Sequence, residues 1–236
     1  MLNKLGTLEK QVLSVVITFI LYSLLIGWKI AALLVVAIVF HECCHILAAK
    51  VQGLKTRGMY LIPFIGGISF VGGPYKKLSQ QAIVVLAGPF GGGVLAFLTF
   101  GLYVMTGISF LGFSAYLMGA MNLFNLLPLA MMDGGQLMNT ISYSFNRKLG
   151  LKLQVISSIL AVILLAIYLN PVIALFIGFL GYRSIKIEYL NQKNNITTNQ
   201  AAIMNNNQMF LTSVGWILTA TSLIWLLRQL KSFSIF

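Results

Sequence analysis

Residues 30–51 of the chain read IAALLVVAIVFHECCHILAAKV. The run is apolar over most of its length, and about 20 such residues cross the hydrocarbon core of a bilayer as a helix. Both histidines of the chain, His41 and His45, lie in it, and Glu42 follows the first of them. Positions four apart on a helix lie on one face, a turn apart. The run therefore predicts a membrane-buried helix with two imidazole rings side by side.

The composition of the whole chain predicts an integral membrane protein. Of its 236 residues, 58% are hydrophobic and 8% are charged, and the mean hydropathy is +0.91. In a soluble domain, about one quarter of the residues are charged. The net charge of +12 comes from lysines and arginines between the apolar runs, where they act as topology signals. We therefore expect the lipid bilayer, and no nucleic acid, as the partner of this surface.

The apolar runs predict an all-α polytopic membrane protein with about six or seven transmembrane helices. In the third run, AGPFGGG is expected to interrupt the helix. The glycine-rich segment RGMYLIPFIGGISFVGGPYKK predicts a short β-hairpin or a re-entrant loop after the helix that holds His41 and His45, which read HExxH with Glu42. The expected spans cover approximately residues 11–27, 30–51, 78–105, 111–136, 151–169, 170–182 and 209–227.

We expect three parts along the chain. Residues 1–29 form an additional N-terminal transmembrane helix, residues 30–149 a catalytic membrane core, and residues 150–236 the C-terminal transmembrane helices with an Asn-rich loop at 191–208. Basic residues collect in alternate connections, which puts the N-terminus in the cytoplasm and the HECCH string toward the cytoplasmic side of the cell membrane. Arg228 and Lys231 would then lie outside, unless the sixth run does not cross and the chain has six spans.

The two histidines and a distant aspartate suggest a catalytic zinc site, in which three protein ligands leave a fourth position open to water. Asp133 is the natural third ligand because it lies deep in an apolar segment, where a charge needs a partner. Pro128 and Gly134 favour a break in the helix that would aim this carboxylate inward. Glu42 would then act as the general base.

Other interpretations of the same residues stay open. The histidines could be helix-packing residues, with Glu42 paired to a lysine. Asp133 could cap the helix that follows it. Cys44 lies three positions after His41, where a sulfur could serve as an additional soft ligand, but small apolar packing is the simpler role for it and for Cys43.

Two motifs carry a family likeness: HECCH at 41–45 matches HExxH, and NLLPLAMMDG at 125–134 matches NxxPxxxxDG. In both, the chain resembles the site-2 proteases, which are membrane-embedded zinc metalloproteases. The resemblance implies one Zn²⁺ per chain, held by His41, His45 and Asp133, with Glu42 as the base. It also implies that Asn125 supports the site or the substrate.

Two further segments extend the resemblance, which covers about residues 30–147. LIPFIGGISF is similar to a hairpin that lines the substrate path, where Gly66 and Gly67 would contact a substrate added as a further strand. AGPFGG matches a GPxxN pattern only in part, because Gly92 stands at the asparagine position. The connection between the second and third spans is too short for a PDZ domain. The resemblance is thus to a minimal, bacterial-type member without a PDZ or C-terminal regulatory domain.

The expected function is that of an intramembrane zinc metalloendopeptidase. It would hydrolyse a peptide bond in a membrane-anchored protein or a small precursor peptide near the cytoplasmic face. Release of a regulator and maturation of a peptide fit equally, and a regulatory membrane partner is compatible with both. The alternative is a non-catalytic metal-binding membrane protein, either a pseudoprotease or a transporter-like protein. A transporter is disfavoured because acids in several spans and internal repeats are not found.

Overall fold

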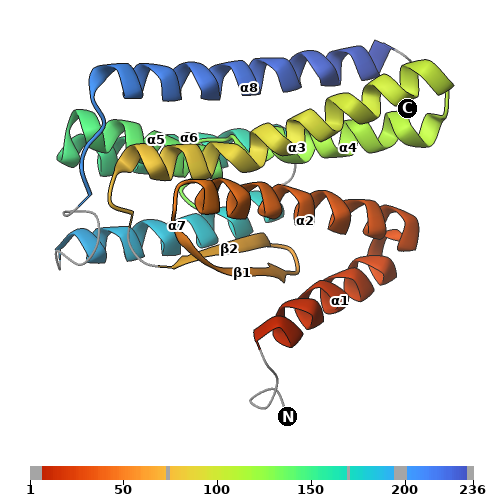
Figure 1. Cartoon of the computed structure of the whole chain (residues 1–236), viewed down its shortest axis with the longest axis horizontal. Coiled ribbons are helices and arrows are strands. Elements are labelled where there is room, and N and C mark those ends of the chain that lie inside the picture. The colour runs from red at the N-terminus through yellow and green to blue at the C-terminus, as the bar shows by residue number, and fades with distance from the viewer. Residues whose placement is uncertain (1–6, 73–74, 169–170, 194–200, 233–236) are drawn as a thin grey trace. The chain divides into compact units, whose positions relative to one another are not determined.

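A computed structural model describes residues 7–72, 75–168, 171–193 and 201–232. In these residues the chain is an all-α membrane protein with one small antiparallel hairpin, as predicted (Figure 1). The elements are α1 (Thr7–Ile26), α2 (Trp28–Val51), β1 (Lys55–Ile62), β2 (Gly66–Gly72), α3 (Leu78–Thr106), α4 (Ser109–Asn125), α5 (Asp133–Phe145), α6 (Arg147–Tyr168), α7 (Pro171–Lys193) and α8 (Asn206–Ser232).

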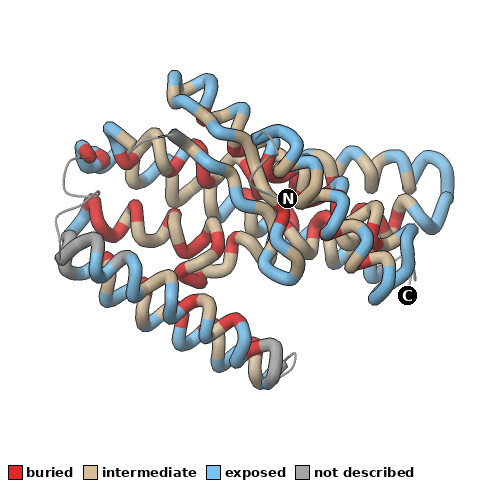
Figure 2. Tube along the Cα trace, turned by 90° about the horizontal axis from the view of Figure 1, so that it is seen from below, coloured by how far each residue is buried: buried red, intermediate tan, exposed pale blue. Residues whose placement is uncertain are grey.

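Five of the described helices, α1, α2, α3, α6 and α8, are long and apolar enough to cross a membrane. Each of the seven expected spans overlaps a helix, although the fourth, expected to reach residue 136, ends as a helix at Asn125. Two of these helices fall short of the measure for a membrane span. Helix α4 has 17 residues, and α7 continues past its apolar half into a segment with Arg183 and Lys186. Many large apolar residues of the helices are exposed, as expected for contact with lipid. Figure 2 marks exposed residues along the chain in pale blue.

The prediction that the third span is interrupted is wrong. Helix α3 continues without a break through AGPFGGG, with Pro89 inside it. The glycines serve instead to bring neighbouring helices close. A Cβ atom at Gly91 would overlap the sulfur of Cys44 on α2, and one at Gly92 would overlap the amide of Asn122 on α4.

The chain divides into two compact units. The first comprises Met1–Gly73, Phe90–Asn122 and Leu223–Phe236. Its core includes Ala31, Val35 and Ile38 of α2, which pack with Tyr22 of α1 and Leu61 of β1. This cluster joins the first two helices to the hairpin.

A stripe of polar side chains on α1 covers the backbone of β1 and the turn after it. The stripe consists of Gln11, Ser14, Thr18 and Tyr22, which share one helix face because they are three or four positions apart. Buried backbone groups of a strand edge need hydrogen-bond partners, and this stripe supplies them. The hydrogen bonds, donor first, run from Gln11 Nε2 to Arg57 O (2.8 Å), Leu61 N to Ser14 Oγ (3.1 Å), Thr18 Oγ1 to Leu61 O (3.5 Å) and Phe64 N to the Tyr22 hydroxyl (3.0 Å).

The hairpin itself is a two-stranded antiparallel sheet, so β2 has a strand neighbour on one side only. Leu61 pairs with Gly67 and Met59 with Ser69. The register shifts between Thr56 and Met59. Among the described residues, the second edge of β2 therefore carries no paired strand.

The second unit comprises Pro74–Pro89 and Leu123–Ser222. Its core joins α6 and α7 to the segment between α4 and α5, with Leu129, Met132, Leu165 and Ile177 buried together. That segment, residues 126–132, is not helical. Its backbone groups find side-chain partners instead: Ser157 Oγ donates to Pro128 O (3.0 Å), Ala130 N to Ser158 Oγ (3.1 Å), Ser184 Oγ to Ala130 O (3.3 Å) and Trp216 Nε1 to Leu126 O (3.1 Å).

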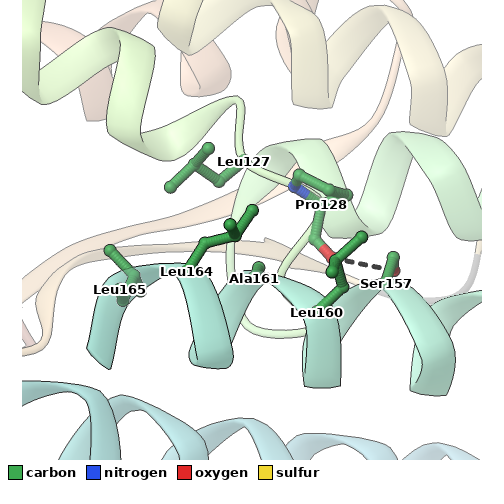
Figure 3. A pocket seen from close by; sticks show the side chains of 7 residues that line it. All are labelled: Leu127, Pro128, Ser157, Leu160, Ala161, Leu164 and Leu165. Carbon is green, nitrogen blue, oxygen red and sulfur yellow. Dashed lines mark hydrogen bonds between the residues drawn. The ribbon is translucent and has the colours of Figure 1, made fainter. Parts of the chain in front are cut away.

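An apolar pocket of about 260 Å³ lies between this non-helical segment and α6 (Figure 3). The one polar side chain in its lining, Ser157, already donates its hydroxyl to Pro128 O. The lining thus offers neither a metal ligand nor a titratable group. It consists of Leu127, Pro128, Ser157, Leu160, Ala161, Leu164 and Leu165.

Candidate metal centre

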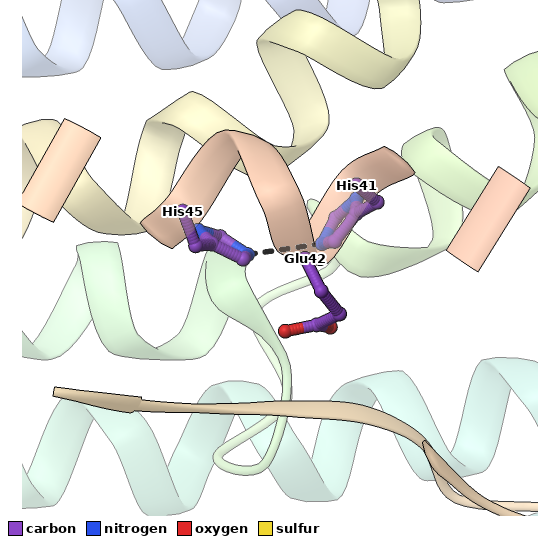
Figure 4. A group of neighbouring side chains, drawn as sticks. All are labelled: His41, Glu42 and His45. Atoms are coloured by element: carbon purple, nitrogen blue, oxygen red, sulfur yellow. Dashed lines mark hydrogen bonds between the residues drawn. The ribbon is translucent and has the colours of Figure 1, made fainter. Parts of the chain in front are cut away.

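Helix α2 places His41, Glu42 and His45 together in the first unit (Figure 4). All three are buried, with exposed fractions of 3%, 5% and 7%. The two imidazole rings have centroids 4.7 Å apart and planes at 80°. Their Nε2 atoms approach each other to 3.0 Å. The one-turn spacing predicted from the sequence is thus realised as two converging ring nitrogens.

This geometry fits a divalent metal ion. The potential ligand atoms of the three residues all lie within 4.8 Å of one another, and within the described part of the chain they form the one group of this kind. In a tetrahedral site with zinc–nitrogen bonds of about 2.05 Å, two ligand nitrogens lie about 3.3 Å apart. The 3.0 Å separation of the Nε2 atoms is close to that value. The donor set of imidazoles and a carboxylate is also the one that zinc prefers.

The carboxylate of Glu42 faces the hairpin and not a lysine. The hydroxyl of Ser69 on β2 donates to Glu42 Oε2 and also lies 3.3 Å from the carbonyl oxygen of the same residue. Gly67 lies beside the Glu42 side chain so closely that a Cβ atom there would overlap it. Among the described residues, the partner of Glu42 is therefore a strand hydroxyl, which does not support the predicted alternative of a lysine pair.

Asn122 on α4 is a polar neighbour of His41. Its Oδ1 lies 2.8 Å from His41 Nδ1, and the residue is only 1% exposed. Sequence reasoning selected Asn125 and overlooked Asn122. A polar amide in an apolar helix was the available signal, but the sequence alone could not indicate which imidazole it would contact.

Gly92 stands where the GPxxN pattern has an asparagine, and another amide lies beside it. Gly92 on α3 lies against the side chain of Asn122, and a Cβ atom at residue 92 would overlap the Asn122 amide. The space that a side chain at residue 92 would enter is thus filled by an amide from α4.

The two cysteines differ in their surroundings. Cys43 is exposed and Cys44 is half-buried. The sulfur of Cys44 packs against Gly91 of α3, and neither cysteine belongs to the group that could hold a metal among the described residues. This contact supports the packing role for Cys44.

Asp133 lies in the second unit, where it is the first residue of α5 and half-buried. The capping position before the helix is occupied by Met132, which makes no side-chain cap. Asp133 therefore stands in the first turn of the helix, one position after the cap. An acid in the first turn is favourable beside the positive end of the helix dipole.

Two glycines after Asp133 determine how closely α5 begins against the preceding segment. A Cβ atom at Gly134 would overlap the carbonyl oxygen of Leu126, and one at Gly135 would overlap that of Leu129. Glycine is thus required here by backbone contact. The predicted break before Asp133 exists, since α4 ends at Asn125 and residues 126–132 are not helical.

Tyr75 lies in the same unit, before α3. Burial raises the pKa of its hydroxyl, and the negative charge of Asp133 raises that pKa further. The hydroxyl therefore stays protonated at neutral pH and remains a hydrogen-bond donor.

The predicted roles of Asn125, Pro128, Gly134, Gly66 and Gly67 stay predictions, as does Asp133 as third ligand. Asn125 is half-buried at the end of α4, and Pro128 lies in the non-helical segment. Gly66 opens β2 with φ of 111°. Gly67 lies against the side chain of Glu42, a member of the candidate centre.

Comparison with known families agrees with the site. The model of Peptidase family M50 matches residues 29–107, which include α2, the hairpin and α3. The match ends before the 125–134 motif. No curated protein was found to match the chain. Over residues 29–107 the chain is thus similar to Peptidase family M50, the site-2 protease family, and this segment holds its histidine pair and Glu42.

Proposed function

We propose that this protein is an intramembrane zinc metalloendopeptidase. The observation that carries the proposal is the convergence of two buried Nε2 atoms beside the Glu42 carboxylate, within a segment that matches a peptidase family. One Zn²⁺ per chain would be held by His41 and His45. Asp133 is proposed as the third ligand from the 125–134 sequence motif.

Glu42 is proposed as the general base and, later, the general acid. When bound, zinc lowers the pKa of water to about 7 and polarises a carbonyl oxygen. Glu42 takes the proton from the attacking water and delivers it to the leaving amine, so the same carboxylate serves both halves of the reaction. The Ser69 hydroxyl holds the Glu42 carboxylate on the hairpin side of α2.

The hairpin is proposed to hold the substrate in an extended form. A helical substrate must unwind before water can attack its peptide bonds, because helical backbone groups are paired internally. The polar stripe of α1 occupies the β1 side of the hairpin, whereas β2 has one edge without a paired strand. A substrate strand added at β2 would run past Gly66 and Gly67 and close to Glu42.

The substrate class is proposed to be a membrane-anchored protein or a small precursor peptide, cut near the cytoplasmic face of the cell membrane. The basic residues of alternate connections support a cytoplasmic N-terminus. The HECCH end of α2 would then face the cytoplasmic side. Either release of a regulator or maturation of a peptide would use this geometry.

The test is a comparison of membrane proteomes from cells that produce the wild-type chain or Glu42→Gln. Sequencing of new protein ends should reveal cleavage within or beside membrane spans in the wild-type sample alone. Glu42→Gln should retain zinc, because two imidazoles and a third ligand remain. Identical protein ends in both samples, with equal amounts of each chain in the membrane, would contradict a peptidase.

A further inference from the structure

The side chain of Asn122 makes two hydrogen bonds inside the first unit. Its Oδ1 lies 2.8 Å from Nδ1 of His41, and its Nδ2 donates to the carbonyl oxygen of Met118, also at 2.8 Å. Asn122 is 1% exposed and His41 is 3% exposed. A buried amide with both ends engaged has a fixed orientation, since a flip would place two acceptors face to face at Met118.

This orientation determines the protonation of the His41 ring. Because Nδ2 is committed to Met118, the atom that faces the imidazole is Oδ1, which can only accept. Nδ1 of His41 must therefore carry the hydrogen. In a neutral imidazole the other nitrogen, Nε2, is then unprotonated and carries a lone pair, and Nε2 is the atom that points toward His45.

Gly92 makes this arrangement possible. Any side chain at residue 92 would overlap the Asn122 amide, so the amide can reach His41 only because α3 presents a glycine there. Elsewhere on the same helix, a Cβ atom at Gly101 would meet no neighbouring atom. The close approach is thus confined to the AGPFGGG part of the helix, where Gly91 likewise lies against Cys44.

We propose that Asn122 is a positioning residue that holds His41 in the Nδ1–H tautomer, with Gly92 as the neighbour that leaves room for it. The inference rests on the proposed function, because the Nε2 lone pair of His41 would be directed to a metal ion. Partners of this kind fix the ring orientation of ligating histidines, and their loss typically weakens metal binding by about 10-fold to 100-fold.

The first measurement is zinc affinity of the purified full chain, by competition with a chromophoric chelator. Asn122→Ala should weaken zinc binding by about 10-fold to 100-fold, whereas Asn122→Asp should retain most of the affinity, because a carboxylate oxygen also accepts from Nδ1–H. Gly92→Ala should weaken binding as Asn122→Ala does. Ser114→Ala, a buried change on α4, and Gly101→Ala on α3 are the matched controls and should bind zinc as the wild type does.

The second measurement reads the tautomer without metal. The chain has only two histidines, so ¹⁵N-labelled histidine gives a spectrum with two rings to assign. His41 should be protonated at Nδ1 in the wild type and should lose this preference in Asn122→Ala. A wild-type His41 protonated at Nε2, or unchanged zinc affinity in Asn122→Ala, would overturn the positioning role. The Nδ1–H tautomer in a wild-type chain without zinc affinity would instead contradict the proposed peptidase.

Discussion

At the scale of single residues, the candidate centre is built from small contacts around Glu42. The carboxylate lies between α2 and β2, with the Ser69 hydroxyl as its donor and Gly67 directly against its side chain. Because residue 67 is a glycine, the strand comes close to the Glu42 side chain. Any larger residue at this position would need the space that Glu42 occupies. The position of Glu42 therefore depends on the absence of a side chain on the neighbouring strand.

Gly67→Ala should reduce proteolysis by about 100-fold, because displacement of a catalytic group by about 1 Å can cost that much. The added methyl group would push Glu42 away from its present position, while His41 and His45 stay in place, so zinc content should not change. Cleavage of a co-produced substrate, once identified by new protein ends, gives the measurement. Ile68→Ala, at the neighbouring exposed position, is the control and should keep most activity. Full activity of Gly67→Ala would contradict the assigned position of the base.

The sequence predicted part of this centre and could not predict the rest. The pairing of His41 with His45 follows from helix periodicity, which acts within one element. The partners Asn122 and Ser69 come from other elements and meet α2 only through tertiary packing. Their identity depends on helix rotation and strand register, which a single sequence does not determine.

At the scale of elements, α1 acts as a polar cover for the hairpin. Ser14 and Tyr22 accept hydrogen bonds from the backbone N–H groups of Leu61 and Phe64. These groups would otherwise lack partners in an apolar surrounding, which is costly. The family match begins at residue 29, so α1 contributes this cover from outside the matched segment.

Removal of the two acceptors should loosen the hairpin. In Ser14→Ala/Tyr22→Phe, each lost hydrogen bond should reduce local stability by about 0.5–1.5 kcal/mol. The amides of Leu61 and Phe64 should then exchange hydrogen for deuterium several-fold faster. Ser23→Ala is the matched control on α1, because the Ser23 hydroxyl is buried without a hydrogen-bond partner among the described residues. Equal exchange in the double variant and the wild type would show that α1 does not secure the hairpin.

The elements show where periodicity suffices and where it fails. The predicted hairpin is confirmed as β1 and β2, since glycines and a proline end the helical pattern there. The predicted interruption in α3 failed because glycine and proline were interpreted as helix breakers. Inside a membrane, where an unpaired backbone group is costly, a helix retains its hydrogen bonds, and the glycines of AGPFGGG provide close packing instead.

At the scale of the whole molecule, composition alone indicated a membrane protein, and five described helices meet the requirements for a span. Orientation in the membrane is a separate property, carried by the charges of the connections. Five basic residues lie at the end of the second predicted span or between it and the third: Lys50, Lys55, Arg57, Lys76 and Lys77. The following connection, around Gly107 and Ile108, has no charged residue.

The charge pattern predicts that the hairpin connection faces the cytoplasm and the α3–α4 connection faces outside. Single cysteines can test this in a background of Cys43→Ala/Cys44→Ala. In intact cells, a membrane-impermeant maleimide should label Ile108→Cys and should not label Lys55→Cys, while both should react after the cells are opened. Labelling of Lys55→Cys in intact cells would reverse the proposed orientation.

The most direct test of the central claim is the metal content of the purified chain. The account predicts about one zinc ion per chain in the wild type, as expected for a catalytic site with three protein ligands. Zinc should be nearly absent from His45→Ala and reduced in Asp133→Asn, and Glu42→Gln should retain it. A folded wild-type chain that binds no zinc when the ion is supplied in excess, or a His45→Ala chain that binds it equally well, would contradict the account.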